Sequence, residues 1–230
     1  MVYVFLADGF EEIEALAPVD FLRRAGVEVK TVALNKMSAV GAHSVEVVAD
    51  VNIGDIILND EIEALAPVDF LRRAGVNVKT IALKGKTAVG AHNIEVTADI
   101  NIDDVLLNEK LEAVILPGGM PGSQNLYDNT KVHEAIDFAN DNNKLVCAIC
   151  AAPFILGRKG LLNGKEATCF PGFENELSGA IVKNEGVVKS ENIITAQGAG
   201  VAWEFGERIA RELVGSELSQ KILLGLQWKK

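Results

Sequence analysis

Cys150 is the residue whose type and position best suit covalent chemistry. It follows the apolar run 145–148 and precedes a predicted helix that begins near Ala151. At such a helix N-terminus, backbone N–H groups without intrahelical partners stabilise a thiolate, which is a strong nucleophile. Small neighbours, including Ala152, allow the sharp strand-to-helix turn of a nucleophile elbow. A buried, inert cysteine is the alternative interpretation, because free cysteines are often fully buried.

A carboxylate is the expected proton-transfer partner of this thiol. Glu11, Glu12 and Glu14 lie in the predicted first turn of a helix that extends to about Ala25. Glu14 follows the first predicted strand, at the same end of a parallel sheet as Cys150, so we take it as the candidate base. The alternative is that these glutamates only stabilise the helix, because negative charge is favourable near a helix N-terminus.

Histidines and metal-binding patterns offer no competing chemistry. Three histidines are predicted to lie on the surface: His43, His92 and His133. Cys147 and Cys150 form a C-x-x-C pair, but Cys147 falls inside the predicted strand, which disfavours a thioredoxin-like redox pair. No cysteine or histidine near Cys169 has zinc-site spacing, so we expect no metal and no cofactor.

The segment Pro117-Gly118-Gly119 follows another predicted strand and is a candidate oxyanion site. Glycines have no side chain to shield the backbone, so their N–H groups can donate to a developing negative charge. A tight turn with positive φ is the alternative interpretation, and both can hold together.

Part of the chain is repeated in tandem. Residues 12–60 and 61–109, the first and second repeat, align without a gap, and 35 of the 49 pairs are identical. The first sixteen pairs match at every position, so Glu63 is the equivalent of Glu14. Two copies are too few for a solenoid. Without one copy the chain has 181 residues, so we predict a single domain over 1–230.

The composition indicates a soluble globular protein and excludes several classes. Hydrophobic residues make up 49% and charged residues 23%. The net charge of −10 disfavours nucleic acid as a partner. No apolar run has the length of a membrane span, and the start lacks the basic region of a signal peptide. Three cysteines, an odd number, favour a reducing compartment, so we expect a cytoplasmic protein.

Apolar strands that alternate with helices predict an α/β fold with a mainly parallel sheet and helices on both faces. Strands are predicted at 2–6, 27–34, 45–49, 76–83, 94–98, 111–116 and 145–148, and around 181, 187 and 193. Helices are predicted at 12–25, 62–74, 131–140, 202–214 and 217–225. Sites in such sheets lie beyond the carboxyl ends of the strands, which indicates the turns at 8–14, 117–122 and 147–153.

These turns together resemble the ThiJ/PfpI superfamily, specifically the branch of parkinsonism-associated deglycases. The motifs are ADGFEEIEALAPVDFLRRAG near the start, LPGGMPG at 116–122, CAICAAP at 147–153 and QGAGVAWEFG at 197–206. With one repeat removed, the resemblance covers essentially the whole chain. It implies a flavodoxin-like α/β sandwich, usually a homodimer.

The resemblance also implies roles for individual residues. Cys150 would be the nucleophile, and Glu14 or Glu63 the acid that hydrogen-bonds to it. The backbone of Gly119 and of Ala151 would supply oxyanion donors, next to Gly118.

Two positions depart from other branches of the superfamily. Ala151 stands where the protease branch has a histidine, which argues against peptidase activity. Phe170 stands where some members carry a second histidine near the site.

One site with two candidate glutamates requires a choice between the repeats. We favour Glu14, because it keeps the turn 7–10 between the first strand and the helix, whereas Glu63 follows residues 58–60. On this interpretation 61–109 is an insertion that forms a long loop, and the entropic cost of such a loop is tolerable. A second interpretation incorporates the second repeat and loops out the first. A third exchanges the spare segment with a partner chain in a domain swap.

The implied activity is that of a cofactor-independent glyoxalase on methylglyoxal-type 2-oxoaldehydes. The Cys150 thiolate would add to the aldehyde, and the glutamate would transfer a proton between the two carbons. One alternative is a non-catalytic redox sensor or chaperone of the same family, in which Cys150 is oxidised. Another is a duplication variant whose site is disabled.

Overall fold

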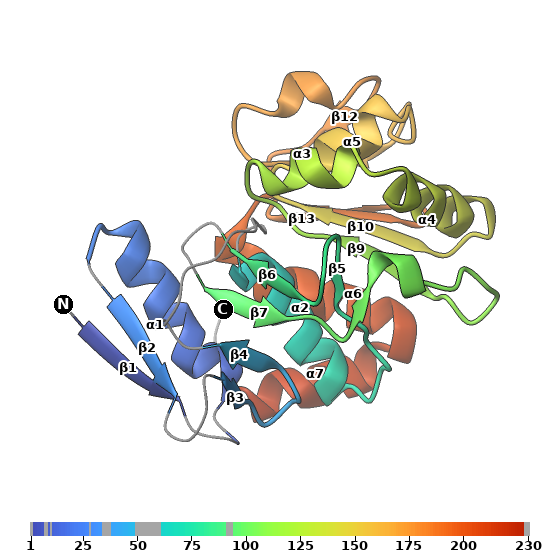
Figure 1. Ribbon diagram of the computed structural model, residues 1–230. Coiled ribbons are helices and arrows are strands. Elements are labelled where there is room, and N and C mark those ends of the chain that lie inside the picture. Colours follow the sequence, from blue (N-terminus) through green and yellow to red (C-terminus); the bar gives the residue numbers. More distant parts are fainter. Residues whose placement is uncertain are drawn as a thin grey trace.

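A computed structural model of the chain describes residues 2–6, 9, 11–27, 29–33, 38–48, 61–90 and 94–227. Its central sheet has the strand order β13-β14-β10-β9 (Figure 1). The strands are β9 (Ala113–Leu116), β10 (Leu145–Ile149), β13 (Val187–Ser190) and β14 (Ile193–Ala196). Only β13 is antiparallel to its neighbour, which confirms the predicted mainly parallel sheet.

Apolar cores lie on both faces of this sheet. Along β10, Val146 and Ala148 point into one core, and Cys147 and Ile149 into the other, as the two-residue period of a strand requires. The helices are α2 (Glu61–Arg73), α3 (Gly122–Tyr127), α4 (Thr130–Asp141), α5 (Pro153–Arg158), α6 (Ala202–Val214) and α7 (Ser216–Gly225). Helices α4 and α5 pack in the first core, and α2 and α6 in the second.

Short elements complete the part of the chain from residue 113 to residue 227, which we call the main body. Strands β11 (Glu166–Ala167) and β12 (Ile181–Val182) form a small parallel pair. Two 3-10 helices, at Glu174–Glu176 and Ala199–Val201, join longer elements. Another, Ile102–Asp104, lies in the second repeat.

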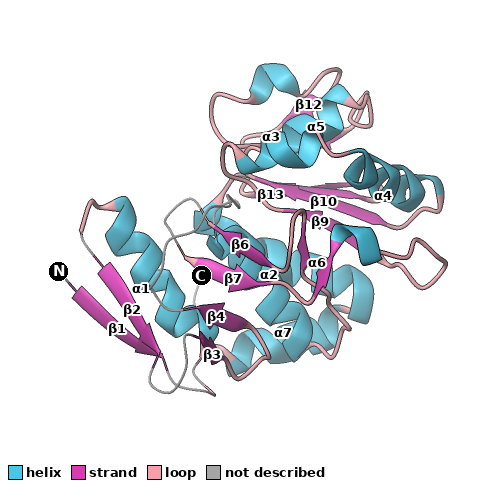
Figure 2. Cartoon of the chain, in the orientation of Figure 1, coloured by secondary structure: helices cyan, strands magenta, loops and turns pink. Residues whose placement is uncertain are grey.

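The N-terminal elements form a separate unit beside the central sheet. Strand β1 (Val2–Leu6) pairs in parallel with β2 (Val29–Ala33), and α1 (Glu12–Arg24) connects them. Figure 2 shows this pair apart from the central strands, with α1 between it and α2. The first repeat therefore packs on the second without joining the central sheet.

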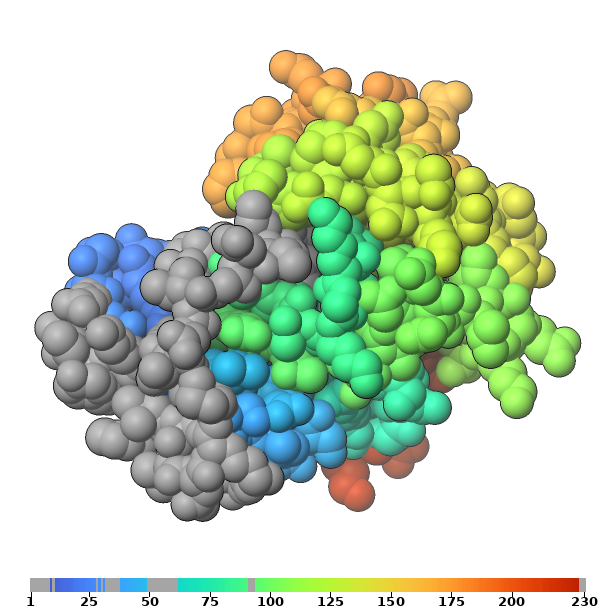
Figure 3. All heavy atoms as spheres, in the orientation of Figure 1, coloured from blue at the N-terminus to red at the C-terminus, as the bar shows by residue number. Residues whose placement is uncertain are grey.

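The hairpins of the two repeats form a shared antiparallel sheet with the order β3-β4-β7-β6. Its strands are β3 (Ser38–Val40), β4 (Glu46–Val48), β6 (Thr87–Val89) and β7 (Glu95–Thr97). In Figure 3 the second repeat lies between the blue first repeat and the yellow and orange part of the main body. The β4 and β7 strands were predicted, whereas the β3 and β6 strands were not.

The predicted strand at 76–83 is mostly wrong. Only Ile81–Ala82 (β5) forms a strand, and it pairs in parallel with Ile100–Asn101 (β8). The same segment of the first repeat is the five-residue β2, because there β1 supplies a partner strand. None of the helices in the described residues combines the length and the apolar character that a membrane span requires.

Candidate active site

Cys150 lies in a strained turn at the carboxyl end of β10. Its φ is 62°, in the left-handed region that residues with a side chain rarely adopt. Two hydrogen bonds hold the turn: its N–H donates to Ala196 O at 2.9 Å, and its carbonyl accepts from Phe170 N at 2.8 Å. The residue is 6% exposed, and α5 begins at Pro153. Backbone strain of this kind is typical of functional positions.

The carboxylate that lies beside Cys150 is that of Glu63. A Cβ built on Gly118 would be 2.2 Å from Glu63 Oε2 and 2.3 Å from Cys150 Cβ. A Cβ on Gly198 would be 3.8 Å from Glu63 Oε1 and 3.9 Å from Cys150 Sγ. Glu63 is fully buried. The two glycines thus leave the space in which a carboxylate and a thiol from distant segments meet.

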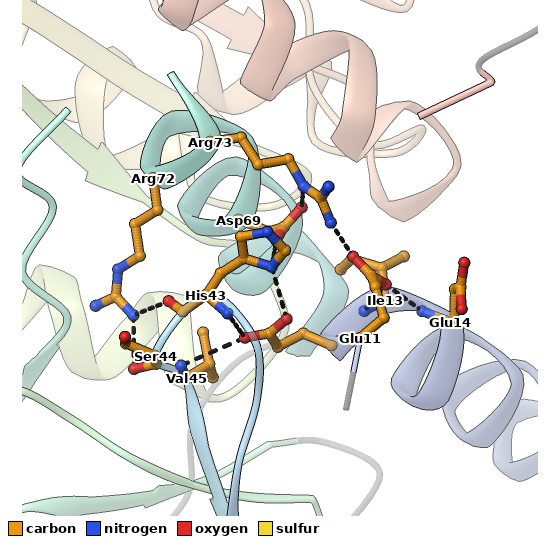
Figure 4. Close-up of polar contacts among 10 residues, drawn as sticks. Glu11, Ile13, Glu14, His43, Ser44, Val45, Asp69, Arg72 and Arg73 are labelled. Carbon is orange, nitrogen blue, oxygen red and sulfur yellow. Dashed lines mark hydrogen bonds and ion pairs between the residues drawn. The ribbon is translucent and has the colours of Figure 1, made fainter. Parts of the chain in front are cut away.

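Glu14, the residue favoured from the sequence, is placed elsewhere. It is exposed on the first turn of α1, where its N–H donates to Glu11 Oε2 at 2.8 Å (Figure 4). The preference relied on continuity with the first strand, but α1 does not pack on the central sheet. The turn 7–10 and residues 58–60, on which the choice depended, lie mostly outside the described residues.

Close packing between α2 and α6 holds Glu63 in place. A Cβ on Gly206 of α6 would be 2.9 Å from Pro67 Cα and 3.3 Å from Phe70 Cβ, so only glycine allows this approach. Phe70 is fully buried, and its ring lies edge-on to Trp203, with centroids 6.3 Å apart. One turn of α2 before these contacts, the Glu63 side chain reaches the cysteine turn.

The glycine segment after β9 borders the same site. Gly118 contacts both Glu63 and Cys150, and Gly119 has a φ of 78°, as the predicted tight turn requires. Phe170 lies at the edge, with Cδ2 3.4 Å from the position of a Cβ on Gly198. The role of Gly118, Gly119 and Ala151 as oxyanion donors stays a prediction.

The other two cysteines are buried among apolar side chains. Burial, and to a lesser extent the charge of Glu212, raises the pKa of Cys147 far above its usual value. Burial, with Glu174 adding to it, raises the pKa of Cys169 to about 11. Both thiols therefore stay protonated near neutral pH, which agrees with the interpretation of Cys147 as a core residue.

Two histidines are less exposed than predicted. His133 is half-buried, with Nε2 2.5 Å from Tyr127 O and Nδ1 3.1 Å from Lys159 Nζ. His43 is half-buried between two carboxylates, and His92 lies outside the described residues. His43 becomes half-buried because the second repeat packs on its turn, and no local sequence pattern indicates that contact.

A second cluster of polar side chains lies between the repeats and had not been predicted. Glu11, Glu12, His43 and Asp69 place ligand-type atoms within 4.8 Å of one another. Arg73 already pairs with both Asp69 and Glu11, so a cation at this position would compete with a guanidinium. This cluster is better described as a buried ion-pair network than as a metal site.

A surface hollow of about 460 Å³ lies at the opposite end of β10 from Cys150. Lys144, Asn192 and other polar residues line it.

Of the residues that border the candidate site, Gly198 was the least evident from the sequence. It belongs to the motif at 197–206, and only the close approach of its backbone to the thiol shows why a glycine is needed there.

Two relatives match nearly the whole of this chain, and a third matches about half of it. Protein dj-1beta of Drosophila melanogaster is 35% identical over 226 residues, which cover 97% of this chain and 94% of the relative. The Parkinson disease protein 7 homolog of Danio rerio is 33% identical over 223 residues, covering 95% and 92%. The glutathione-independent glyoxalase DJR-1.2 of Caenorhabditis elegans is 30% identical over 112 residues, covering 48% and 59%.

Solved structures have the same fold. The crystal structure of Drosophila melanogaster DJ-1beta superposes with a TM-score of 0.70 at 32% identity, covering 76% of this chain and 96% of that one. Oxidized DJ-1 of Toxoplasma gondii superposes with a TM-score of 0.71 at 30% identity, covering 76% and 98%. Both are covered almost completely by about three quarters of this chain, consistent with one additional repeat. The flavodoxin-like α/β fold is thus confirmed.

The family comparison reflects the repeat as well. The model of the DJ-1/PfpI family matches residues 1–60 and, separately, residues 58–212. Each match contains one copy of the repeated segment, and the second continues through the cysteine turn. With a match over more than half of its length and relatives that align along nearly all of it, this chain belongs to the DJ-1/PfpI family.

Proposed function

We propose that this protein is a cofactor-independent glyoxalase, or a deglycase-like enzyme, that acts on methylglyoxal-type 2-oxoaldehydes through Cys150 and Glu63. The observation that carries the proposal is that the buried Glu63 carboxylate and Cys150 both lie against Gly118 and Gly198. The relative named as a glutathione-independent glyoxalase supports this reaction class.

The proposed reaction needs one nucleophile and one proton carrier. The Cys150 thiolate adds to the aldehyde carbon and forms a hemithioacetal. The Glu63 carboxylate removes the proton from that carbon and returns it to the neighbouring carbon, which converts the hemithioacetal into a thioester. Water then cleaves the thioester, so that methylglyoxal becomes lactate and the thiol is restored.

The two repeats provide a matched test of this assignment. We expect Glu63→Gln to lower turnover of methylglyoxal by about 10²- to 10⁴-fold, the usual effect of removing a general base. Glu14→Gln makes the same change in an identical local sequence on an exposed turn and should leave turnover unchanged. Lactate formation without glutathione or metal is the measurement, with Cys150→Ser as the inactive reference. Equal losses in both glutamine variants, or loss only with Glu14→Gln, would contradict the assignment.

A redox sensor or chaperone of the same family is the second candidate function. Its support is the same buried contact, because a carboxylate beside Cys150 can stabilise a sulfinic acid formed by a peroxide. The two functions differ in one observable. Lactate formation that depends on Cys150 supports the enzyme, whereas selective oxidation of Cys150 without turnover supports the sensor. Absence of both would support a site disabled by the duplication.

The proposed partners are a small aldehyde substrate and a second copy of the repeated segment, from the same chain or from another chain. Proteins of the DJ-1 family are typically homodimeric, which supports self-association. With two repeats, this association can form between chains, with or without a domain swap, or within one chain. We place the protein in the cytoplasm, because its three cysteines, Cys147, Cys150 and Cys169, are free thiols that suit a reducing compartment.

A further inference from the structure

The hairpins of the two repeats pair in a symmetric register. Strand β4 of the first repeat runs antiparallel to β7 of the second, and three pairs of residues lie opposite each other: Glu46 and Thr97, Val47 and Val96, and Val48 and Glu95. Thr97 is the repeat equivalent of Val48, and Glu95 is the equivalent of Glu46. The pairing is therefore unchanged when the two repeats are interchanged. This property defines an isologous interface, with Val47 and Val96 at its axis.

A histidine of the first repeat joins carboxylates of both repeats. His43 Nδ1 lies 2.9 Å from Glu12 Oε2 of its own repeat and 2.7 Å from Asp69 Oδ1 of the other (Figure 4). Glu12 also accepts from His43 N at 2.7 Å, and both carboxylates are fully buried. The contact between the repeats thus brings a buried carboxylate of each repeat to the same imidazole nitrogen.

Two arginines of α2 extend this network across the contact. Arg72 Nη1 donates to the carbonyl oxygens of His43, at 3.0 Å, and of Ser44, at 2.8 Å. Arg73 Nε donates to Asp69 Oδ2 at 2.7 Å, and its Nη2 donates to Glu11, the residue directly before the first repeat. Such geometrically restricted contacts give specificity to an interface, beyond the apolar contact of α1 with α2.

The two repeats differ in whether the phenylalanine of their helix is covered by the main body. Phe21 of α1 is 73% exposed, whereas its equivalent, Phe70 of α2, is fully buried against α6. The helices have identical sequences, so the main body accounts for this difference. The second repeat packs directly on the main body through α2 and α6. The first contacts the second from outside, as the same segment of another subunit would in an isologous dimer.

We infer that the first repeat is an internal partner, which occupies within one chain the self-complementary surface through which a second copy of this segment would bind. That surface consists of α2 and the β6–β7 hairpin. Because the first repeat covers it, this surface does not pair with a second chain. A linked partner also has a high effective concentration, which favours closure within the chain over association between chains.

Engineered disulfides in the full chain test this inference. Glu46→Cys with Thr97→Cys introduces thiols at directly opposed, half-buried positions of β4 and β7. Under oxidised glutathione, we expect an intrachain disulfide, seen as a monomer on a non-reducing gel and as a linked peptide by mass spectrometry. Its yield should stay constant when the protein is diluted about a hundredfold, as closure within one chain requires.

Two control variants make the result decisive. Glu46→Cys with Glu95→Cys places the thiols two residues out of register, about 7 Å or more apart, where a disulfide does not form readily. A single Val47→Cys faces Val96 in the closed chain, but would face its own copy if two chains paired through their first repeats. Covalent dimers of Val47→Cys, a crosslink of the opposed pair only between chains, or no crosslink of that pair would each overturn the inference.

Discussion

The three cysteines show how surroundings separate residues of one type. Cys147 and Cys169 are enclosed by apolar side chains, and burial raises the pKa of each thiol, that of Cys169 to about 11. Cys150 instead sits in a left-handed turn beside a carboxylate and two glycines. Because the thiolate is the reactive form, raised pKa values make the two core cysteines inert at neutral pH.

Alkylation should therefore distinguish the three thiols. With iodoacetamide at neutral pH, we expect Cys147 and Cys169 to stay unmodified and any label in the folded protein to appear at Cys150. Labelling of Cys169 should increase as the pH approaches about 11, because the thiolate fraction rises toward its pKa. Peptide mass spectrometry measures each site. Fast labelling of Cys169 at pH 7 would contradict the burial seen here.

Gly118 is expected to be essential because of the space it leaves. In Gly118→Ala the new methyl group would be 2.2 Å from Glu63 Oε2 and 2.3 Å from Cys150 Cβ, so these groups must move apart. We expect loss of most turnover and a decrease of about 1–3 kcal/mol in the free energy of unfolding, as overpacking usually costs. Gly200→Ala, where a Cβ meets nothing within 4 Å, is the control and should retain activity. Equal turnover in both variants would rule out this steric explanation.

At the scale of elements, α1 and α2 are a natural comparison of one sequence in two environments. Both are 13-residue helices with the sequence EIEALAPVDFLRR. Intrinsic helix propensity and charge placement within the two helices are therefore the same, and tertiary contacts account for their different burial. Among the described contacts, Gly206 of α6 approaches Pro67 and Phe70 of α2, and α1 has no such contact.

The same phenylalanine should consequently have two different energetic roles. Phe70→Ala removes a fully buried ring and should lower the free energy of unfolding by about 3–5 kcal/mol. Phe21→Ala removes a ring that is 73% exposed and should change it by no more than about 0.5 kcal/mol. Urea denaturation measures both. A large loss with Phe21→Ala would show that α1, rather than α2, is packed on the main body.

For the whole molecule, contact between the repeats links stability to pH through Asp69. Burial raises the pKa of this carboxyl above 3.8, and the pairing with Arg73 offsets only part of the effect. The folded state then binds more protons than the unfolded state between the two pKa values. The stabilising contribution is complete below the unfolded pKa and is lost as the pH rises through the folded pKa.

Asp69→Asn should remove this contribution to the pH dependence. From about pH 4 upward, through the raised pKa, the free energy of unfolding of the variant should fall less, or rise more, with pH than that of the unmodified protein. Urea unfolding at a series of pH values measures the slope. Identical slopes in the two proteins would show that Asp69 titrates alike in the folded and unfolded chain.

Much of the architecture followed from the sequence because periodicity and turn residues are local signals. The strands at 2–6 and 145–149, the α1 and α6 helices and the cysteine turn agree with prediction to within a few residues. Four short strands, β3, β6, β8 and β11, were missed, and the strand at 76–83 was overpredicted. In each case the length of the strand depends on which partner strand is available.

By itself, the sequence determined the family resemblance, the alternation of strands and helices, the cysteine turn and the existence of two equivalent glutamates. Only the tertiary structure decided that Glu63, rather than Glu14, lies beside Cys150. Sixteen identical residues surround or follow the two glutamates, so no local preference can separate them. The main body packs closely against α2 of the second repeat. The first repeat, with α1, then packs on the self-complementary surface that the second repeat presents.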